Sequence, residues 1–369
     1  MDASHLFTLA VCAALGLQLL YILFVFRAFF ALPKVEGEPA ASAQPLSVVV
    51  CARNELENLQ KHLPLWLAQE HPAFEWVVVN DRSWDESQEW LESVAERDPR
   101  LRIVEIKDND RFWFGKNFAL TLGIKAAKYD RLVLTDADGV PESRDWLRRM
   151  DAALRTPHDL VLGYGPYRTE SSWISWVSAF DALQTAVHYF GWSGLGKPYM
   201  GVGRNMAYHR ALFMANKGFS GHMDVISSDD DLFVAAVATP DNHRALIDPK
   251  AMVWSEAPED FKAWWHQKKR HLLAAPRYRP LHRYGLGLWG LSTFLIYALA
   301  MGWAFWGTPL AGYLLLGRFV VVTGVFYAAG RRLGTPKPAW VLFPAELGIV
   351  VSQAVLLIAN RFGPKLKNW

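Results

Sequence analysis

Residues 131–138 read Arg131-Leu132-Val133-Leu134-Thr135-Asp136-Ala137-Asp138, and this stretch decides the predicted fold. Leu132-Val133-Leu134 is a short apolar run typical of a buried β-strand, and we predict a strand over residues 131–135. Two carboxylates, separated by one residue, follow where that strand ends. Such a pair offers hard oxygen ligands, which suit Mg²⁺ or Mn²⁺ better than zinc.

The segments before this strand alternate between strand-like and helix-like patterns. Strands are predicted at residues 46–50, 76–79 and 102–106, and helices over residues 57–68 and 117–128. Ser83-Trp84-Asp85-Glu86 matches a capping box and predicts that another helix opens there. Because the two kinds of segment alternate, we expect an α/β domain with a largely parallel sheet.

Polar residues follow three of the four predicted strands. The first strand runs into Ala52-Arg53-Asn54-Glu55, the second into Asn80-Asp81-Arg82-Ser83 and the fourth into Asp136-Ala137-Asp138. Each acid alone is more often a helix cap or turn residue than a ligand. However, the carboxyl ends of parallel strands share one sheet edge, so these acids are expected in one cleft. Gathered there, they need a cation or a positively charged ligand.

The composition combines a soluble part with a membrane part. Of 369 residues, 51% are hydrophobic and 20% are charged, and 17 are Trp, which excludes a disordered chain. A net charge of +3 gives no support for nucleic-acid binding, and two cysteines exclude a disulfide framework. The sequence contains neither a P-loop nor a strand-linked dinucleotide-binding motif, so any nucleotide site must be of another type.

The two ends of the chain carry the membrane signal. Residues 6–26 contain no Asp, Glu, Lys or Arg and predict a transmembrane helix. A cleaved signal peptide ending near Ala41-Ser42-Ala43 is the alternative, but the basic region that normally opens one is missing. Residues 284–317 are also uncharged and predict a helical hairpin that turns at Gly307-Thr308-Pro309. Basic residues after the first helix and on both sides of the hairpin place the intervening domain in the cytosol.

Two features of the C-terminal region allow alternative interpretations. Arg318 lies inside the hairpin, where it either snorkels to the interface or pairs with a group such as Glu346. The last apolar segment, residues 339–360, is interrupted by Pro344 and Glu346 and either spans the membrane or is re-entrant or interfacial. Basic residues follow this segment. If the segment crosses the whole membrane, these residues lie on the non-cytoplasmic side, contrary to the positive-inside rule. The expected domains are an anchor and linker (1–44), a cytosolic domain (45–280) and a membrane region (281–369).

Seven motifs, taken in order, resemble those of the membrane-bound family 2 glycosyltransferases, whose nucleotide-sugar-binding domain has the Rossmann-like GT-A fold. The matching stretches are Val48-Val49-Val50-Cys51-Ala52-Arg53-Asn54-Glu55, Asn80-Asp81-Arg82-Ser83, Gly115-Lys116-Asn117, Thr135-Asp136-Ala137-Asp138, Gly203-Arg204-Asn205, Ser228-Asp229-Asp230-Asp231-Leu232 and Gln267-Lys268-Lys269-Arg270-His271. The resemblance implies an α/β GT-A domain with N-terminal and C-terminal transmembrane helices.

The resemblance also implies where the donor lies. The residues expected to hold its base and ribose are Ala52, Arg53, Asn54, Glu55 and Asp81, with Lys116 nearby. Asp136 and Asp138 correspond to the family's DxD motif, which contacts the ribose or a divalent cation, Mg²⁺ or Mn²⁺, on the diphosphate.

Gln267 and Arg270 match a Gln-x-x-Arg-Trp motif, with Arg270 facing the diphosphate. The Trp of that motif is His271 here, which favours single or few transfers over processive synthesis. The same segment also has the pattern of a basic helix on the membrane surface, with Phe261, Trp264, Trp265 and Leu272 in the interface, and both roles can hold.

The general base is implied to lie within Asp229-Asp230-Asp231. We assign it to Asp230, with Asp229 as its neighbour and Asp231 starting or supporting a helix over residues 232–237. The expected protein is an inverting glycosyltransferase of the inner or plasma membrane, with a cytoplasmic catalytic domain and no nucleic-acid partner. It would move sugar from a UDP-linked or other nucleoside-diphosphate donor to a hydroxyl on a lipid-linked or membrane-delivered glycan acceptor. The alternatives are a subunit of a processive polysaccharide synthase and a non-catalytic scaffold that binds nucleotide sugars.

Overall fold

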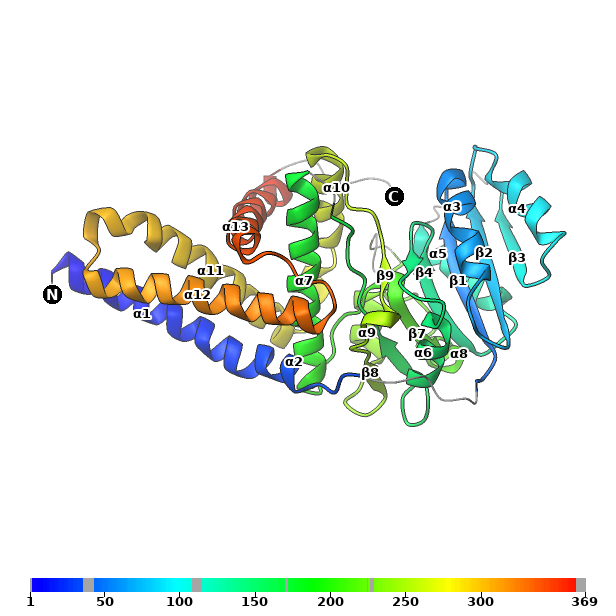
Figure 1. The fold of residues 1–369 in the computed structure, drawn as a ribbon, viewed down its shortest axis with the longest axis horizontal. Coiled ribbons are helices and arrows are strands. Elements are labelled where there is room, and N and C mark those ends of the chain that lie inside the picture. The colour runs from blue at the N-terminus through cyan, green and yellow to red at the C-terminus, as the bar shows by residue number, and fades with distance from the viewer. Residues whose placement is uncertain are drawn as a thin grey trace.

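The computed structural model describes residues 2–35, 43–107, 115–169, 172–223, 225 and 229–362, and the side chains only as far as residue 359. An α/β domain carries the sheet, and a helical bundle extends from one side of it (Figure 1). The strands are β1 Leu46–Ala52, β2 Phe74–Asp81, β3 Leu101–Ile106, β4 Arg131–Asp136, β5 Val140–Pro141, β6 Leu160–Leu162, β7 Met206–His209, β8 His243–Ala245 and β9 Val253–Trp254. The helices of this domain are α3 Leu56–Leu67, α4 Ser87–Ala95, α5 Lys116–Ala126, α6 Trp146–Ala153, α7 Trp173–Gly194, α8 Arg210–Ala215, α9 Asp231–Val237 and α10 Phe261–His271, with short 3-10 turns at Gly203–Asn205, Pro249–Ala251 and Ala275–Arg277.

The main sheet has seven strands in the order β3-β2-β1-β4-β7-β6-β8. Strands β1 to β4 pair in parallel, as expected, whereas β7 runs antiparallel to its neighbours β4 and β6. The predicted α/β fold is therefore confirmed, with a mixed sheet. Because β2, β1 and β4 are adjacent and parallel, their carboxyl ends lie at one edge.

Alternate residues of the central strands face two separate cores. Val49 and Val77 face a core that includes α5 and α7, whereas Val48 and Val78 face one built from α3, α4 and α6. Both faces are covered, so these strands are continuous apolar runs rather than alternating ones. At Gly123 on α5, a Cβ would lie 2.6 Å from Val49 Cγ1, so glycine permits this close helix–sheet contact.

The predicted capping box at Ser83 is wrong. Helix α4 begins at Ser87, and the Ser83 hydroxyl instead accepts a hydrogen bond from the Asn54 backbone N–H, at 2.9 Å. Asp85 accepts from the Ser87 N–H at 3.1 Å. Ser83 therefore joins the loops after β1 and β2 instead of starting a helix.

Among the residues that the structure describes, four helices are long and apolar enough to cross a membrane. They are the continuous segment of α1 Ala3–Tyr21, a π-helical turn Ile22–Phe26 and α2 Arg27–Ala31, followed by α11 Pro280–Trp306, α12 Pro309–Arg332 and α13 Ala339–Phe362. The predicted hairpin is confirmed, because α11 ends and α12 begins on either side of Gly307 and Thr308. Helix α13 is continuous through Pro344, and the side chains of the basic residues after Asn360 lie outside the described part. In Figure 1, α1, α11 and α12 lie together, while α7 crosses between this bundle and the sheet.

Arg318 is held by partners inside the bundle. Its terminal nitrogens donate to the two Glu346 carboxylate oxygens at 2.6 and 2.8 Å, and its Nε donates to Gln18 Oε1 at 2.9 Å. Tyr297 donates to Glu346 at 2.9 Å, and Gln18 donates to Thr293 at 2.7 Å. Of the two interpretations of Arg318, pairing with Glu346 is the one observed, and the network joins α1, α11, α12 and α13.

Candidate active site

The three polar loops predicted to converge do lie together at the sheet edge. In the strand register Asp136 is opposite Cys51, and Ala52 is opposite Asn80. The ends of β2, β1 and β4 therefore stand level, and Asp81 is the last residue of β2. This arrangement places the Ala52–Glu55 loop between the loops that carry Asp81 and Asp136.

The loops after β1 and β2 hold each other in unusual backbone conformations. Asn54 and Arg82 have φ values of +56° and +55°, a region that non-glycine residues adopt only occasionally. The Trp84 N–H donates to Asn54 Oδ1 at 2.9 Å, and Arg82 Nε donates to buried Asp81 at 2.8 Å. The Arg53 guanidinium lies over the Trp84 ring, 5.6 Å from its centroid. Together, these contacts join the loops after β1 and β2 to one another at the strand ends.

Glu55 lies in the loop after β1, and its side chain is partly buried. Burial raises the pKa of Glu55, although the Asn58 side chain donates a hydrogen bond to it at 2.6 Å. Asp138 and Asp136 contribute to the same rise. The repulsion shows that the β1 loop and the end of β4 act on one another electrostatically.

Lys116, at the start of α5, lies between two of the acidic segments. Its ammonium is 2.8 Å from Asp136 Oδ1 and 3.0 Å from Asp229 Oδ2. Burial acts to lower the pKa of Lys116, but Asp136 and Asp229 outweigh it and the pKa is well above its usual value. Lys116 thus links the end of β4 to Asp229, which lies 93 positions after Asp136 in the sequence.

The turn after β4 is fixed from below by two aromatic side chains of α3. His62 Nδ1 contacts the Ala137 carbonyl at 3.1 Å, and Trp66 Nε1 donates to the Gly139 carbonyl at 2.8 Å. A Cβ at Gly139 would lie 2.5 Å from Thr135 Oγ1, so this tight turn needs a glycine. The carboxylates of Asp136 and Asp138 are therefore presented by a rigid turn.

These two carboxylates have the chemistry to hold a hard cation. Burial and the neighbouring charge of Asp136 raise the pKa of Asp138, which indicates too little positive charge around it. Among the residues described, no three His, Cys, Asp or Glu side chains come together as a ready-made metal site. The set fits a Mg²⁺ or Mn²⁺ ion whose remaining ligands are phosphate oxygens and water.

The three consecutive aspartates have different environments. Asp229 is buried and pairs with Lys116, and Asp231 is buried and accepts a hydrogen bond from the Tyr278 hydroxyl at 2.6 Å. Asp230 is more exposed than either, and its Oδ2 accepts from the Gly203 N–H at 3.0 Å. Burial, Asp229 and Asp231 raise the pKa of Asp230 well above its usual value. As expected, Asp231 begins α9; Ser228 of the same motif lies outside the described residues.

Helix α10 contributes Gln267 and Arg270 to the other side of the site. Gln267 donates to the Tyr167 hydroxyl at 2.9 Å. Burial acts to raise the pKa of Asp136, but Lys116 lowers it, and Arg204 and Arg270 add to this lowering. Trp264 is 3% exposed and packs in the core, so its expected place in the membrane interface is wrong, whereas Phe261 is 57% exposed.

Sequence reasoning did not include Arg204 among the candidate site residues. Its guanidinium lies 4.4 Å from the centroid of the Tyr167 ring and donates to the Gly165 carbonyl. Although burial acts to lower it, Tyr167 and Asp138 raise the pKa of Arg204. The Gly203-Arg204-Asn205 motif was the available signal, but only the fold brings Arg204 toward Asp138.

Two family models match the chain: glycosyl transferase family 2 over residues 47–215 and glycosyl transferase family group 2 over residues 132–352. One relative is the 4,4'-diaponeurosporenoate glycosyltransferase of Staphylococcus haemolyticus, 27% identical over 58% of this chain and 56% of the relative. Another is the poly-beta-1,6-N-acetyl-D-glucosamine synthase of Staphylococcus aureus, 22% identical over 68% of this chain and 59% of the relative. The chain thus spans little more than half the length of these curated relatives.

A solved structure matches almost the whole chain. It is a mannosyltransferase from Pyrobaculum calidifontis in complex with GDP-Man and Mn²⁺, with a TM-score of 0.65 and 20% identity, covering 98% of this chain and 99% of that one. At this identity the match establishes the fold, a GT-A-like mixed-sheet domain with long apolar helices at both ends. The family models, the second of which covers more than half of the chain, establish that the protein belongs to glycosyltransferase family 2.

Proposed function

We propose that this protein is a membrane-anchored, inverting glycosyltransferase that uses a nucleoside-diphosphate sugar. The observation that carries this proposal is the position of Lys116, which joins Asp136 at the donor side of the cleft to Asp229 at its other side. This contact supports a site in which the donor carboxylates lie close to Asp229, the neighbour of the proposed base. A UDP-sugar remains the favoured donor, and GDP-mannose becomes a second candidate because of the ligand in the Pyrobaculum structure.

Each group in the cleft has a separate proposed task. The loop of Ala52–Glu55 and Asp81 holds the base and ribose, while Arg204 and Arg270 supply positive charge on the diphosphate side. When bound by Asp136 and Asp138, a divalent cation would stabilise the negative charge that develops on the leaving nucleotide.

Asp230 is proposed as the general base. Its Oδ1 accepts from the Asp231 N–H at 2.8 Å and its Oδ2 from the Gly203 N–H, so the carboxylate is held in place. A raised pKa makes the carboxylate a stronger proton acceptor. Asp230 takes the proton from an acceptor hydroxyl while that oxygen attacks the anomeric carbon, and the configuration of this carbon inverts.

The proposed acceptor is lipid-linked or delivered at the membrane, and the proposed orientation has the catalytic domain in the cytoplasm. The end of α2, the start of α11 and the end of α12 all lie on the side of the bundle that faces the sheet (Figure 1). Arg27, the first residue of the five-residue α2, lies within a turn of its end, and Arg283 and Arg331 lie within a turn of the other two helix ends. This is the charge distribution of the cytoplasmic side of a membrane protein.

A donor screen followed by one substitution tests the proposal. Thermal unfolding of the purified protein should shift upward with a UDP-sugar or GDP-mannose when Mn²⁺ is present. Asp230→Asn should slow transfer by about 10²–10⁴-fold, since it removes the base. Asp241→Asn, at an exposed position, is the matched control. Equal, near-zero turnover in the wild type and Asp230→Asn would instead support a binding scaffold.

A processive synthase is a second candidate, because one relative is named as a poly-beta-1,6-N-acetyl-D-glucosamine synthase. His271, in place of the Trp of the motif, argues for single or few transfers. Chromatography of the products separates the two candidates. Single-sugar products support our proposal, and long chains would replace it with the synthase.

A further inference from the structure

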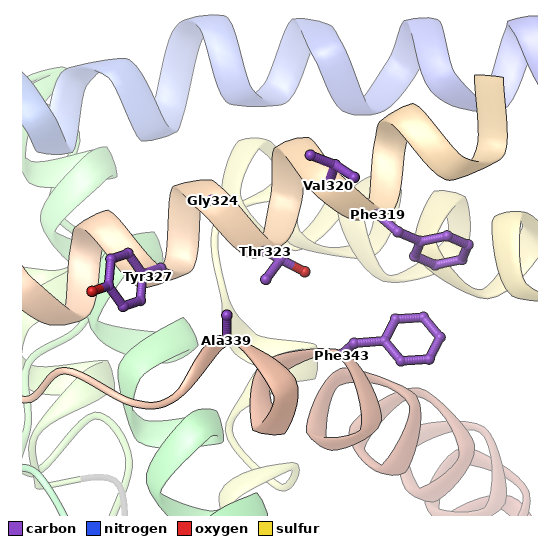
Figure 2. A pocket seen from close by; sticks show the side chains of 7 residues that line it. All are labelled: Phe319, Val320, Thr323, Gly324, Tyr327, Ala339 and Phe343. Carbon is purple, nitrogen blue, oxygen red and sulfur yellow. The ribbon is translucent and has the colours of Figure 1, made fainter. Parts of the chain in front are cut away.

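An apolar groove lies between two of the membrane helices, α12 and α13. Its volume is about 410 Å³, within the range of about 300–1,000 Å³ that is usual for small-molecule sites. Figure 2 shows its lining, which includes Phe319, Thr323, Tyr327, Ala339 and Phe343. Both helices are long and apolar enough to span a membrane. Inside the membrane, only the apolar part of a membrane molecule can reach this groove.

A lysine lies beside one end of the groove. Lys337 is two residues before Ala339, which lines the groove, and its side chain is half-buried. Its ammonium donates to Thr169 Oγ1 at 3.3 Å and lies 5.4 Å from the centroid of the Trp176 ring. Within the described residues, no carboxylate forms an ion pair with Lys337. Burial lowers its pKa, so an anionic partner would be favoured there.

The segment that Lys337 contacts leads directly to the donor site. Thr169 follows Arg168, whose backbone N–H donates to the Ser255 carbonyl at 2.9 Å. The Ser255 side chain, in turn, is near enough to Asp138 to act on the pKa of its carboxyl, which it lowers. Tyr167, in the same segment, contacts both Gln267 and Arg204. An anionic group beside Lys337 would therefore lie at the membrane side of the proposed active site.

We propose that the α12–α13 groove binds the hydrocarbon chain of a phosphate-bearing membrane lipid, with Lys337 and Thr169 contacting its phosphate, and that this lipid is the acceptor. An ammonium at the membrane surface attracts anionic lipid headgroups, and lysine binds phosphate as a point charge. The assignment as an acceptor site rests on the proposed glycosyltransferase function, whereas the lipid-binding site itself does not.

Photolabelling of the full chain tests the site. The protein is placed in phosphatidylcholine vesicles containing a minor fraction of phosphatidic acid whose acyl chain carries a diazirine. We expect crosslinks to peptides of α12 and α13 that include the groove residues. Lys337→Gln should lower this labelling about fivefold, and Lys337→Arg should preserve it. Arg331→Gln, which removes an exposed cation at the end of α12, is the matched control and should have no effect.

A second variant tests the groove independently of the charge. No atom lies within 4 Å of a Cβ placed at Gly324, so Gly324→Leu fills the groove without a clash at its Cβ. It should reduce the labelling by the phosphatidic acid probe and by a phosphatidylcholine probe with the same chain. Unchanged labelling in both Lys337→Gln and Gly324→Leu, or equal losses in Lys337→Gln and Arg331→Gln, would overturn the proposal.

The labelling test of the lipid site can fail independently of the donor-binding test of the proposed function. Donor-induced thermal shifts measured on the same preparations report on the nucleotide-sugar site alone. Normal donor shifts and transfer with no specific labelling would refute the lipid site and leave the glycosyltransferase proposal intact. Specific labelling without any donor shift or transfer would support the lipid site and refute its role in acceptor binding.

Discussion

The molecule contains two charge clusters that are built in opposite ways. In the helical bundle, Arg318 donates to Gln18 and to both oxygens of Glu346, so each of its nitrogens has a partner. At the sheet edge, Lys116 alone is paired with both Asp136 and Asp229. In the described part of the chain, Asp138 and Asp230 form no ion pair. A fully compensated cluster stabilises the packing of helices, whereas a cluster with excess negative charge is suited to binding a cation.

Breaking the bundle cluster should have the largest effect on stability. Arg318→Met leaves the Glu346 carboxylate buried without its main partner, which should cost about 3–5 kcal/mol of unfolding free energy. The double variant Arg318→Met/Glu346→Met should recover most of this loss, because apolar side chains often replace a buried ion pair without cost. Thermal unfolding in detergent measures both. A single variant as stable as the wild type would show that the pair is not buried in the folded protein.

Removing Lys116 tests whether the cleft lacks positive charge. Lys116→Met leaves Asp136 and Asp229 without their shared partner, and we expect a loss of about 2–3 kcal/mol, because Lys116 is partly exposed. Unlike the loss in the bundle, this one should be partly recovered when Mn²⁺ is added, since a metal ion can replace the ammonium. Lys61→Met, at an exposed position of α3, is the control. Unfolding temperatures that do not respond to Mn²⁺ would contradict the contrast between the clusters.

The same two clusters show how far sequence reasoning reaches. The carboxylates after β1, β2 and β4 were predictable because strand ends can be read from local patterns, and parallel pairing brings these ends together. The hairpin followed from hydropathy and length. The contact of Lys116 with Asp229 was not predictable, because it depends on how α5 and the segment before α9 pack against the sheet.

Two further features needed the folded structure. Ser83 matched a helix cap locally, but Asn54 competes for its hydroxyl from a loop 29 positions earlier in the sequence. The sequence allowed two environments for Arg318. The packing of α13 against α12 brings Glu346 to Arg318 and forms the ion pair. The candidate site residues were found by their order and spacing, whereas the register of the base within Asp229–Asp231 depends on contacts with Lys116, Gly203 and Tyr278.

Substitution of Asp138 sharpens the cation prediction at the cleft. Asp138→Ala removes one of the two proposed cation ligands, and metal affinity should fall on the order of 100-fold. Donor binding measured by calorimetry should then lose its dependence on Mn²⁺, while folding is retained. Asp241→Ala, at an exposed position, should leave binding unchanged. Wild-type donor affinity in Asp138→Ala with Mn²⁺ present would argue against a cation at this position.

Asp231 should produce the smallest effect, through the pH dependence of stability. Burial raises its pKa to about 6, although the Tyr278 hydroxyl and the Leu232 N–H stabilise the carboxylate and act in the opposite direction. In the unfolded chain the pKa is about 3.9. Between these values the folded protein binds more protons than the unfolded chain, so Asp231 makes stability fall as pH rises from about 4 to about 6. Asp231→Asn keeps a partner for Tyr278 but cannot ionise, so it should remove this part of the slope and raise stability at pH 7. The difference between wild-type and variant unfolding free energies, followed across this range, isolates Asp231 from other titrating groups. A difference that stays constant with pH would mean that the Asp231 carboxyl has its ordinary pKa, and that it is not removed from water as its place beside the cluster requires.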